Sequence, residues 1–465
     1  MFSKPLFLSP TSGTTAFTID QSIRFNDDDS AYMYRTPSSA SNRDKWTWSG
    51  WIKRGNISAN LQMFSAPLGS SAGYMSIQYD SSDSFMLYQW TGSGYDFDVR
   101  TTQVFRDLSA WYHYVVVYDS GNAISTERVK LYVNGQRITN LTGASSVVYP
   151  SQNTDSYINN TVQHSIGYYI RPPSAGGQYF DGYMTEINFI DGLALDPSYF
   201  GETTSNGLWI PKAYDGSYGT NGFRIDGRDA SDLGDDESGN GNDFTTSGLA
   251  THDQFLDSPT NNFCTINPLA NRLITYKNGN MESNATSQTT AHKTVKSTLG
   301  IPPSATGKYY FEWQVPSSTS SGDVDMIGFC DLEDGTNTES STVNSGRGYG
   351  IGYKIGTGNV YAGTGWTANS FTFGGFVASN YYGFAYDAST GKLYIYQNGS
   401  ALNSGAHVAT FDKSSTIAPG YSQYYNTSTY KFFNGAQTSL TNSNFNYAPP
   451  TGYVPINTAN IGDEF

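Results

Sequence analysis

Two carboxylates on one short stretch of the chain could perform acid–base chemistry on a glycosidic bond. They belong to residues 186–191, EINFID, which alternate polar and apolar side chains as a strand does. Retaining hydrolysis needs two carboxyl groups ~5–5.5 Å apart, one as nucleophile and one as general acid. Glu186 and Asp191 are the candidate pair, although Asn188 stands between them and Asp191 has the shorter acidic side chain. The alternative is a core strand followed by its turn, and we favour that interpretation.

Aspartates in the middle of the chain could hold calcium. Positions 214–257 contain ten acidic and two basic residues and so supply −8 of the net charge of −14. Calcium prefers hard oxygen ligands on a turn-rich backbone. The candidate ligands are Asp226, Asp229, Asp232, Asp235, Asp236 and Asp243, with the amides of Asn240 and Asn242. The spacing is not that of an EF-hand, so a solvated acidic linker remains an equal alternative.

Aromatic clusters beside polar residues could bind sugars. Aromatic rings stack on sugar rings, while amide, hydroxyl and carboxylate groups bond the sugar hydroxyls. The candidates are Tyr88 and Trp90 with Tyr95, Tyr168 and Tyr169 with Arg171, and Trp366. Each could equally lie in a core or at a subunit interface.

The other reactive residues form no recognisable catalytic set. His113 lies between two tyrosines on an expected core strand, and no Ser-His-Asp or Cys-His arrangement can be assembled from neighbouring residues. Residues 348–352, GYGIG, lack the lysine of a phosphate-binding loop. Cys264 and Cys330 show no metal spacing and cannot build a disulfide framework. We therefore expect a protein that is not an enzyme.

The elements that must position these residues are strands. Aromatic residues make up 15% of the chain, and no segment has helical periodicity or the ~18 apolar residues of a membrane span. Residues 112–119 and 128–135 read as a strand pair ending in Asn-Gly, and residues 381–387 and 391–399 repeat this pattern. Asn-Gly supplies the positive φ angles of a tight hairpin turn. The repeat predicts an all-β protein with two successive antiparallel β-sandwich domains.

The domain boundaries follow from where these strand patterns begin and end. Residues 1–20 are expected to form an N-terminal arm, and residues 21–213 a first sandwich ending in a short helical turn at 196–200. Residues 214–300 are expected to be an acidic connector rich in Gly, Asn and Asp. Residues 301–465 are expected to form the second sandwich, with a proline-stiffened tail packed on it.

Both sandwiches resemble known families. The first resembles the LamG-like, concanavalin A-like jelly roll at residues 47–53, 111–115, 131–135, 165–167 and 180–195, in the family's order. The second resembles a SPRY domain at residues 307–315, 327–329 and 382–399. The LamG-like resemblance explains 186–191 as a core strand. It also favours calcium binding, since LamG-like relatives often bind calcium, without naming the ligands.

The joint between the sandwiches resembles connectors in structural proteins of tailed phages, of the marine or cyanophage type. The matching segments are 221–226, 236–244 and 258–263. This resemblance implies a virion appendage, of tail-fibre or tail-tip type, that attaches to host-surface polysaccharide. Residues 1–10 make a poor secretory signal, and assembly in the host cytoplasm followed by lysis would explain an extracellular role without one.

The expected partners are host-surface polysaccharide, other virion proteins and further copies of the chain, with a trimer favoured. The negative charge argues against nucleic acid, because phosphate binding needs clustered Lys and Arg, and no membrane insertion is expected. Three alternatives remain open. One is a capsid-decorating or adaptor protein with a purely architectural role. Another is a jelly-roll depolymerase using Glu186 and Asp191, and the last is a cellular SPRY adaptor.

Overall fold

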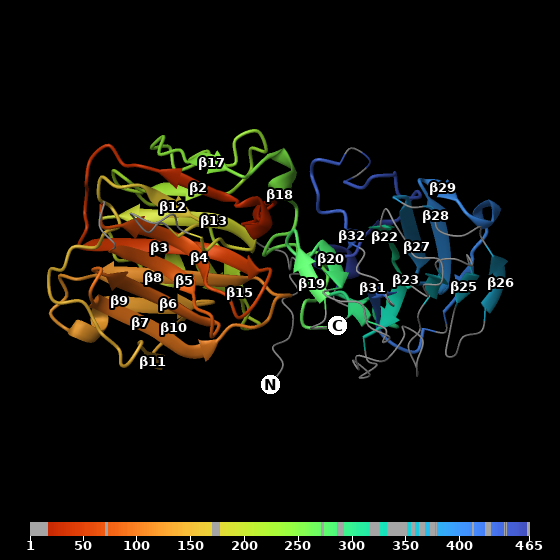
Figure 1. The fold of residues 1–465 in the computed structure, drawn as a ribbon, viewed down its shortest axis with the longest axis horizontal. Coiled ribbons are helices and arrows are strands. Elements are labelled where there is room, and N and C mark those ends of the chain that lie inside the picture. Colours follow the sequence, from red (N-terminus) through yellow and green to blue (C-terminus); the bar gives the residue numbers. More distant parts are fainter. Residues whose placement is uncertain are drawn as a thin grey trace. The chain divides into compact units, whose positions relative to one another are not determined.

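The computed structural model divides the chain into two compact units, with the boundary between Thr260 and Asn261 (Figure 1). It describes residues 17–69, 73–169, 177–270, 274–285, 293–315, 326–332, 351–354, 359–361, 368–372, 377, 379–411, 413–423, 429–440, 442 and 444–462. Both units consist of sheets whose strands are almost all antiparallel, so the predicted all-β class is confirmed.

The first unit is a sandwich of two sheets. In the described residues, one sheet runs β10-β9-β8-β3-β13-β1-β18, and β16 also pairs with β13. Its strands are β1 (Ser22–Phe25), β3 (Lys45–Arg54), β8 (Tyr112–Asp119), β9 (Val129–Val133), β10 (Gln136–Ile138), β13 (Gly182–Asp191), β16 (Phe223–Ile225) and β18 (Gln254–Phe255).

The second sheet of this unit runs β11-β7-β6-β5-β4-β12-β2-β17. Its strands are β2 (Tyr32–Arg35), β4 (Leu61–Pro67), β5 (Tyr74–Tyr79), β6 (Ser84–Trp90), β7 (Tyr95–Val104), β11 (Leu141–Thr142), β12 (His164–Ile166) and β17 (Thr245–Ser247).

Alternation along the strands builds the core between these sheets. Trp46, Trp48 and Ile52 of β3 are fully buried in it, on the strand face that the sequence pattern predicted. Trp46 stacks on Tyr118 with 5.3 Å between ring centroids. Each such aromatic side chain removes roughly 150–250 Å² from water, so this core is the main source of stability of the unit.

The acidic stretch after residue 213 is part of the first sandwich rather than a free-standing connector. Its short strands β16, β17 and β18 pair with β13, β2 and β1. Phe223 and Phe244 pack edge to face in the core, with centroids 4.8 Å apart. Strands of two or three residues carry too little alternation to be recognised in a sequence, and for this reason the boundary expected near residue 213 differs from the one at Thr260.

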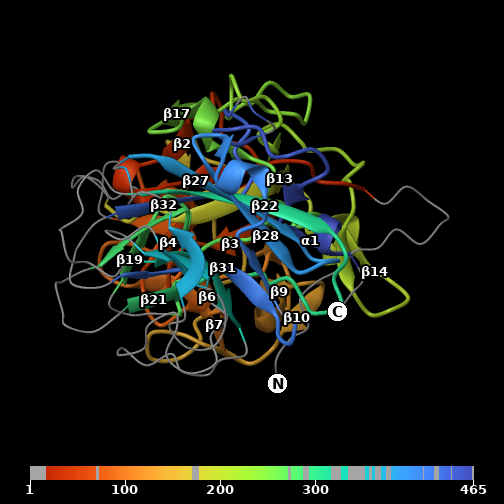
Figure 2. The same ribbon diagram turned by 90° about the vertical axis from the view of Figure 1, so that its right-hand side faces the viewer.

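The second unit begins with strands from the other half of the expected connector. In its described part, one sheet runs β19-β20-β32-β22-β27-β28-β29, with β30 beside β28 and β33 beside β22. Figure 2 labels β19, β32, β22, β27 and β28 of this sheet. The strands are β19 (Ile274–Lys277), β20 (Glu282–Ala285), β22 (Lys308–Gln314), β27 (Tyr381–Asp387), β28 (Lys392–Gln397), β29 (Ser400–Ala401), β30 (Ala409–Thr410), β32 (Thr429–Phe433) and β33 (Val454–Pro455).

The other sheet of the second unit runs β21-β31-β23-β24-β25-β26. Its strands are β21 (Lys293–Lys296), β23 (Met326–Asp331), β24 (Ile351–Lys354), β25 (Asn359–Tyr361), β26 (Ala368–Thr372) and β31 (Ile417–Gln423). The C-terminal segment packs on the first of these sheets, as expected: Phe445 is fully buried against Tyr310, and β33 pairs with β22.

The two predicted Asn-Gly turns have the same geometry. Asn134 and Gly135 have φ of 47° and 76°, and Asn398 and Gly399 have φ of 46° and 76°. In each copy the asparagine side chain accepts a hydrogen bond from a main-chain N–H of the preceding strand, that of His113 at 2.8 Å and that of Tyr381 at 2.9 Å. The strand pairs themselves are also present, since β8 pairs with β9 and β27 pairs with β28, and both predicted hairpins are confirmed.

Within the described residues, no helix has the length and apolar character needed to cross a membrane. The short helical turn expected at 196–200 is present as a 3-10 turn, Pro197–Tyr199, capped by the Asp196 side chain.

Candidate functional site

The outward face of the second sheet of the first unit is rich in tyrosines and side-chain amides. On β5, Met75, Ile77 and Tyr79 enter the core, so Tyr74, Ser76 and Gln78 lie on the opposite face. The same alternation places Tyr88 and Trp90 outward on β6, and Tyr32 and Tyr34 outward on β2. We name this the tyrosine face. Its members are Tyr32, Tyr34, Tyr74, Tyr88, Trp90, Tyr95, Tyr168, Tyr169 and Tyr179.

A chain of ring contacts links one edge of the tyrosine face to its middle. The ring centroids of Trp90 and Tyr95 are 4.9 Å apart, and those of Tyr95 and Tyr88 are 6.0 Å apart. Tyr74 lies 5.4 Å from Tyr88 and 4.5 Å from Tyr169. The intervening strand β4 presents the small Ser65 here, whose hydroxyl donates to the Tyr168 carbonyl at 2.8 Å. The β4 residue opposite Tyr74 is Pro67, and Ser65 lies opposite Ser76.

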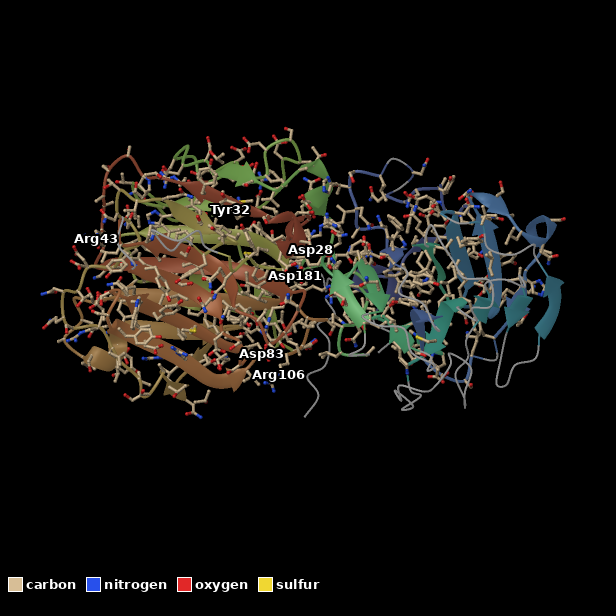
Figure 3. The ribbon with its side chains drawn as sticks, in the orientation of Figure 1. Asp28, Tyr32, Arg43, Asp83, Arg106 and Asp181 are labelled. Carbon is tan, nitrogen blue, oxygen red and sulfur yellow. The ribbon has the colours of Figure 1, made fainter. Side chains whose placement is uncertain are left out.

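The remaining tyrosines form a second group beside β2. Tyr32 lies 4.6 Å from Tyr168 and 5.7 Å from Tyr34, measured between ring centroids. Tyr168 and Tyr179 are 4.8 Å apart, and their main chains form a bridge. All four rings are half-buried, so each keeps part of its surface open to solvent (Figure 3 labels Tyr32).

A network of amides and hydroxyls lies beneath these rings. Gln62 Nε2 donates to Gln78 Oε1 at 2.6 Å and to Gln178 Oε1 at 2.9 Å. Ser76 donates to the Gln62 carbonyl oxygen, and the Tyr88 hydroxyl donates to Gln78 Oε1 at 3.0 Å. Gln62, Gln78 and Ser76 are buried although they lie on the outward face. A buried, satisfied network of this kind holds the rings above it in fixed positions.

The edge of the tyrosine face at β7 is open. Tyr95 is 37% exposed, whereas Tyr88 is only 5% exposed. The Arg100 guanidinium lies 5.9 Å from the Tyr95 ring centroid and is paired with Asp98 at 2.7 Å, so the edge carries little net charge. Burial, with the neighbouring Tyr74, raises the pKa of the Tyr88 phenol well above its usual range, which keeps it a neutral hydroxyl.

The tyrosine face brings together most of the aromatic residues singled out in the sequence. Tyr88, Trp90, Tyr95, Tyr168 and Tyr169 all belong to it. Arg171 and Trp366 lie outside the described residues. Sequence reasoning missed the pairing partners that complete the face, namely Tyr32, Tyr34, Tyr74, Tyr179 and the three glutamines. The alternation in residues 74–79 would have placed Tyr74 and Gln78 on one face, but only the strand order puts that face beside Tyr169.

Glu186 and Asp191 bind different partners. The Glu186 carboxylate accepts hydrogen bonds from Arg224 at 3.0 and 2.5 Å, at a bulge of β13 where Glu186 has φ of 48°. Burial raises the pKa of Glu186, although Arg224 opposes this. Asp191 accepts from Asn159 Nδ2 at 2.5 Å and from the N–H groups of Asn42 and Asn221. Each carboxylate is held by its own donors.

The outward side of the first sheet near Glu186 is closed. Glu186 lines a small space with His113, Trp51, Phe17 and Lys212 that has no room for a water molecule. The β14–β15 hairpin (Gly201–Thr203, Trp209–Pro211) covers this side, and Trp209 Nε1 donates to His113 Nδ1 at 3.1 Å. His113 also bonds Ser49 at 2.8 Å, as a packed core histidine would.

Most aspartates of the acidic stretch accept hydrogen bonds from main-chain N–H groups in turns or form ion pairs with arginines. Asp226 pairs with Arg228 at 2.7 Å and with Arg224 at 3.2 Å. Asp236 accepts from the N–H groups of Arg224, Ser238 and Asn242. Calcium at these carboxylates would have to displace those bonds.

The other carboxylates of the stretch lie in similar turns. Asp229 accepts from Ser231, Asp232 from the N–H of Gly234, and Asp243 from the N–H of Asp236. Burial and the charges of its aspartate neighbours raise the pKa of Asp235. No group of three or more His, Cys, Asp or Glu side chains in the described part of the chain has the geometry of a metal site. Calcium binding here stays a prediction.

Comparison with known proteins identifies the fold of the first unit. Residues 27–198 match the Laminin_G_3 family model, described as the concanavalin A-like lectin/glucanases superfamily. No curated protein sequence matches the chain. The matched segment contains the whole tyrosine face.

Similar solved structures include the SPRY domain of human HERC1, with 12% identity, 38% of this chain and 99% of that chain covered, and a TM-score of 0.29. A putative carbohydrate binding protein from Bacteroides ovatus has 15% identity, 50% and 58% coverage, and a TM-score of 0.29. Domains LG4-5 of the mouse laminin alpha1 chain have 9% identity, 92% and 92% coverage, and a TM-score of 0.28. TM-scores this low leave the ligand of this chain open. The family match shows that residues 27–198 form a laminin G-like, concanavalin A-like jelly-roll domain.

Proposed function

We propose that this chain is a non-catalytic carbohydrate-binding protein and that the tyrosine face is its sugar-binding surface. The observation that carries the proposal is the combination of half-exposed rings with an uncharged, hydrogen-bonded amide network beneath them. Sugar rings stack on exposed aromatic faces, and the buried amide network beneath holds these rings in fixed positions. The match to a superfamily of lectins and glucanases supports a carbohydrate ligand.

A binding role fits the residues better than catalysis does. A retaining glycosidase needs two carboxylates on one open groove, free to meet the scissile bond. Glu186 is tied to Arg224 in a space without room for water, and Asp191 is tied to asparagines. We therefore propose that neither acts as a catalytic group, and that the chain binds glycans without cleaving them.

The setting we propose is a phage appendage of tail-fibre or tail-tip type that attaches to host-surface polysaccharide. Its support is the resemblance of residues 221–226, 236–244 and 258–263 to connectors of tailed-phage structural proteins. Several copies on one appendage, a trimer in the simplest case, would turn weak single sites into strong attachment through avidity. Labelling of phage particles with antibodies against the purified chain tests this setting, and unlabelled particles would overturn it.

The test of sugar binding uses an array of bacterial surface polysaccharides and the purified full chain. Tyr95→Ala and Tyr168→Ala should each weaken binding about fivefold, since one aromatic stacking contact contributes on the order of 1 kcal/mol. Tyr199→Ala is the matched control, because Tyr199 is 45% exposed on the same unit but lies outside the tyrosine face. Equal losses in all three variants would contradict the assignment of the surface.

Release of reducing ends is measured in the same samples. Binding without release supports an adhesin, whereas release that Glu186→Gln abolishes would make the protein a depolymerase. Neither binding nor release with any glycan would favour a purely architectural protein that decorates or joins virion parts.

A further inference from the structure

The outward side of the larger sheet of the second unit carries tyrosines that the C-terminal segment covers only in part. Phe311 of β22 packs on Phe329 of β23, with 4.9 Å between ring centroids, and so lies in the core between the two sheets. Tyr310 alternates with Phe311 and therefore lies on the outward side. Tyr394 and Tyr396 of β28 belong to the same outward cluster as Tyr310, but they are only half-buried.

The C-terminal segment and the loop after β29 complete this patch. Tyr453, just before β33, belongs to the same cluster and is half-buried. His407 is exposed, and its imidazole lies 6.4 Å from the Tyr394 ring, measured between centroids. The Lys308 ammonium lies 5.7 Å from the centroid of the Tyr453 ring. We name Lys308, Tyr394, Tyr396, His407 and Tyr453 the second aromatic surface.

The floor of this surface is held in place by a buried network. A Cβ atom at Gly383 would overlap the Tyr310 hydroxyl, so the Tyr310 ring lies across this position of β27. That hydroxyl donates to Glu312 Oε1 at 3.0 Å. Glu312 is fully buried and also accepts hydrogen bonds at 3.0 Å from Asn446 and from the Tyr447 N–H. Such bonds fix the rings before any ligand arrives, which lowers the entropy cost of binding.

The cation of this surface is more exposed than the anion beside it. Asp387 of β27 pairs in register with Lys308 of β22 and with Lys392 of β28. The Asp387 side chain is only 13% exposed and accepts hydrogen bonds from Ser389 at 2.6 and 3.0 Å. The Lys308 side chain is 46% exposed, and its Nζ lies 3.8 Å from Asp387 Oδ2, beyond hydrogen-bonding distance. The ammonium beside the Tyr453 ring is therefore accessible to an anionic ligand.

We propose that the second aromatic surface is a binding site for an acidic saccharide, namely a uronic acid residue of a polysaccharide. The C–H face of the sugar ring stacks on Tyr394 and Tyr453, and its hydroxyls bond the tyrosine hydroxyls. The sugar carboxylate pairs with the Lys308 ammonium in a charge-assisted hydrogen bond, and the His407 imidazole supplies a further N–H donor. Aromatic rings alone would accept neutral sugars, so the lysine provides the selectivity for acidic ones.

An acidic saccharide suits this surface better than an acidic peptide. An extended peptide binds a sheet by adding a strand at an open edge. Beside the tyrosines, β28 is already paired with β29 and with β30. The proposal does not rest on sugar binding by the tyrosine face, because it concerns the other unit and a charged ligand.

The test is biolayer interferometry of the purified full chain on immobilised polygalacturonate, alginate and hyaluronate, each compared with its neutral methyl ester. At least one acid form should bind about tenfold more tightly than its ester, because a hydrogen bond to a charged group is lost in the ester. Lys308→Gln should remove this difference and leave binding of the ester unchanged. Tyr453→Ala should weaken binding of both forms about fivefold, and Tyr453→Phe, which keeps the ring, should stay close to the wild type.

Lys431→Gln is the matched control for the lysine. The Lys431 side chain is 49% exposed, and its Nζ lies 3.7 Å from Glu282 of the same sheet, but Lys431 lies outside the second aromatic surface. This variant should bind the acid forms as the wild type does. Lys308→Gln changes an exposed side chain, so it keeps the test decisive if Tyr453→Ala does not fold.

The proposal fails if no acidic polysaccharide binds, or if each ester binds as tightly as its acid. Equal losses in Lys308→Gln and Lys431→Gln would also overturn it, since they would indicate non-specific ion exchange. Loss of binding in Tyr168→Ala but not in Tyr453→Ala would place acidic glycans on the tyrosine face, which contradicts this inference and leaves the proposed function intact. Poly-glutamate that binds through Lys308 and Tyr453 as tightly as the polysaccharides would show a peptide site instead.

Discussion

At the scale of single residues, the buried histidines of the first unit are held as neutral imidazoles. His113 Nδ1 accepts from Trp209, and His164 Nε2 accepts from the N–H of Asn159 at 2.8 Å. Burial lowers the pKa of His113 to about 3 and that of His164 to about 4. The sequence predicted His113 as a packed residue, but its partner Trp209 lies 96 positions away, so the tautomer could not be read from neighbouring residues.

These two histidines should make the first unit sensitive to mild acid. The unfolded chain binds protons near a pKa of about 6.5, whereas the folded imidazoles do not, so their contribution is complete above pH 6.5 and is lost as pH falls toward 4 and 3. On going from pH 7 to pH 5, protonation of each histidine in the unfolded chain should lower the free energy of unfolding by about 2 kcal/mol. Denaturant unfolding at both pH values should show this loss.

Asn at position 113 is the informative substitution for the pH effect. Its amide oxygen can accept from Trp209 as Nδ1 does, but it cannot be protonated near neutral pH. His113→Asn should therefore lose about 2 kcal/mol less than the wild type on going from pH 7 to pH 5. Parallel losses in the wild type and the variant would contradict the assignment.

At the scale of elements, sequence patterns predicted the turns and strands that depend on neighbouring residues. The Asn-Gly turns, the alternation of β3 and the 3-10 turn after Asp196 are all confirmed, because each depends on residues that are neighbours in the chain. The short strands β16 to β18 were missed, because their stability comes from partners more than thirty residues away. The candidate site divides in the same way. Tyr88 and Trp90 could be singled out, but Gln62, Gln178 and Tyr32 join them only through the strand order.

Two turn glycines allow two effects of a Gly→Ala substitution on stability to be measured separately: backbone strain at positive φ and steric clash of the new Cβ atom. Gly135 has φ of 76°, and a Cβ there would lie 2.5 Å from the Trp209 ring. Gly207 has φ of 81° and no atom within 4 Å of its Cβ position. Gly207→Ala should cost about 1 kcal/mol, and Gly135→Ala at least about 2 kcal/mol, because Trp209 must also move. Urea unfolding of both variants measures the difference, and equal costs would show that the ring adjusts freely.

At the scale of the whole molecule, each unit contains a buried carboxylate that accepts several hydrogen bonds. In the first unit Asp83, fully buried, accepts from Arg54 at 2.9 Å, Arg106 at 2.7 Å and the Ser58 N–H at 2.7 Å. Burial alone would raise the pKa of Asp83, but the bonds from Arg106, Ser58 and Arg54 outweigh burial and lower it. In the second unit, Glu312 accepts from Tyr310, Asn446 and the Tyr447 N–H at 3.0 Å, and so ties the C-terminal segment to β22.

Substitution of these two buried carboxylates should destabilise one unit at a time. Asp83→Asn leaves the buried Arg54 without its charge partner. Glu312→Gln places an amide N–H₂ group opposite hydrogen-bond donors of Asn446 and Tyr447, which it cannot accept from. Breaking the buried ion pair of Asp83 costs roughly 3–5 kcal/mol, which in a unit of this size lowers the melting temperature by about 6–20 °C. Scanning calorimetry should show that each variant lowers one transition and leaves the other in place. If either substitution shifts the whole unfolding profile together, the two sandwiches unfold as one cooperative unit, and the boundary at Thr260 separates compact parts that do not fold independently.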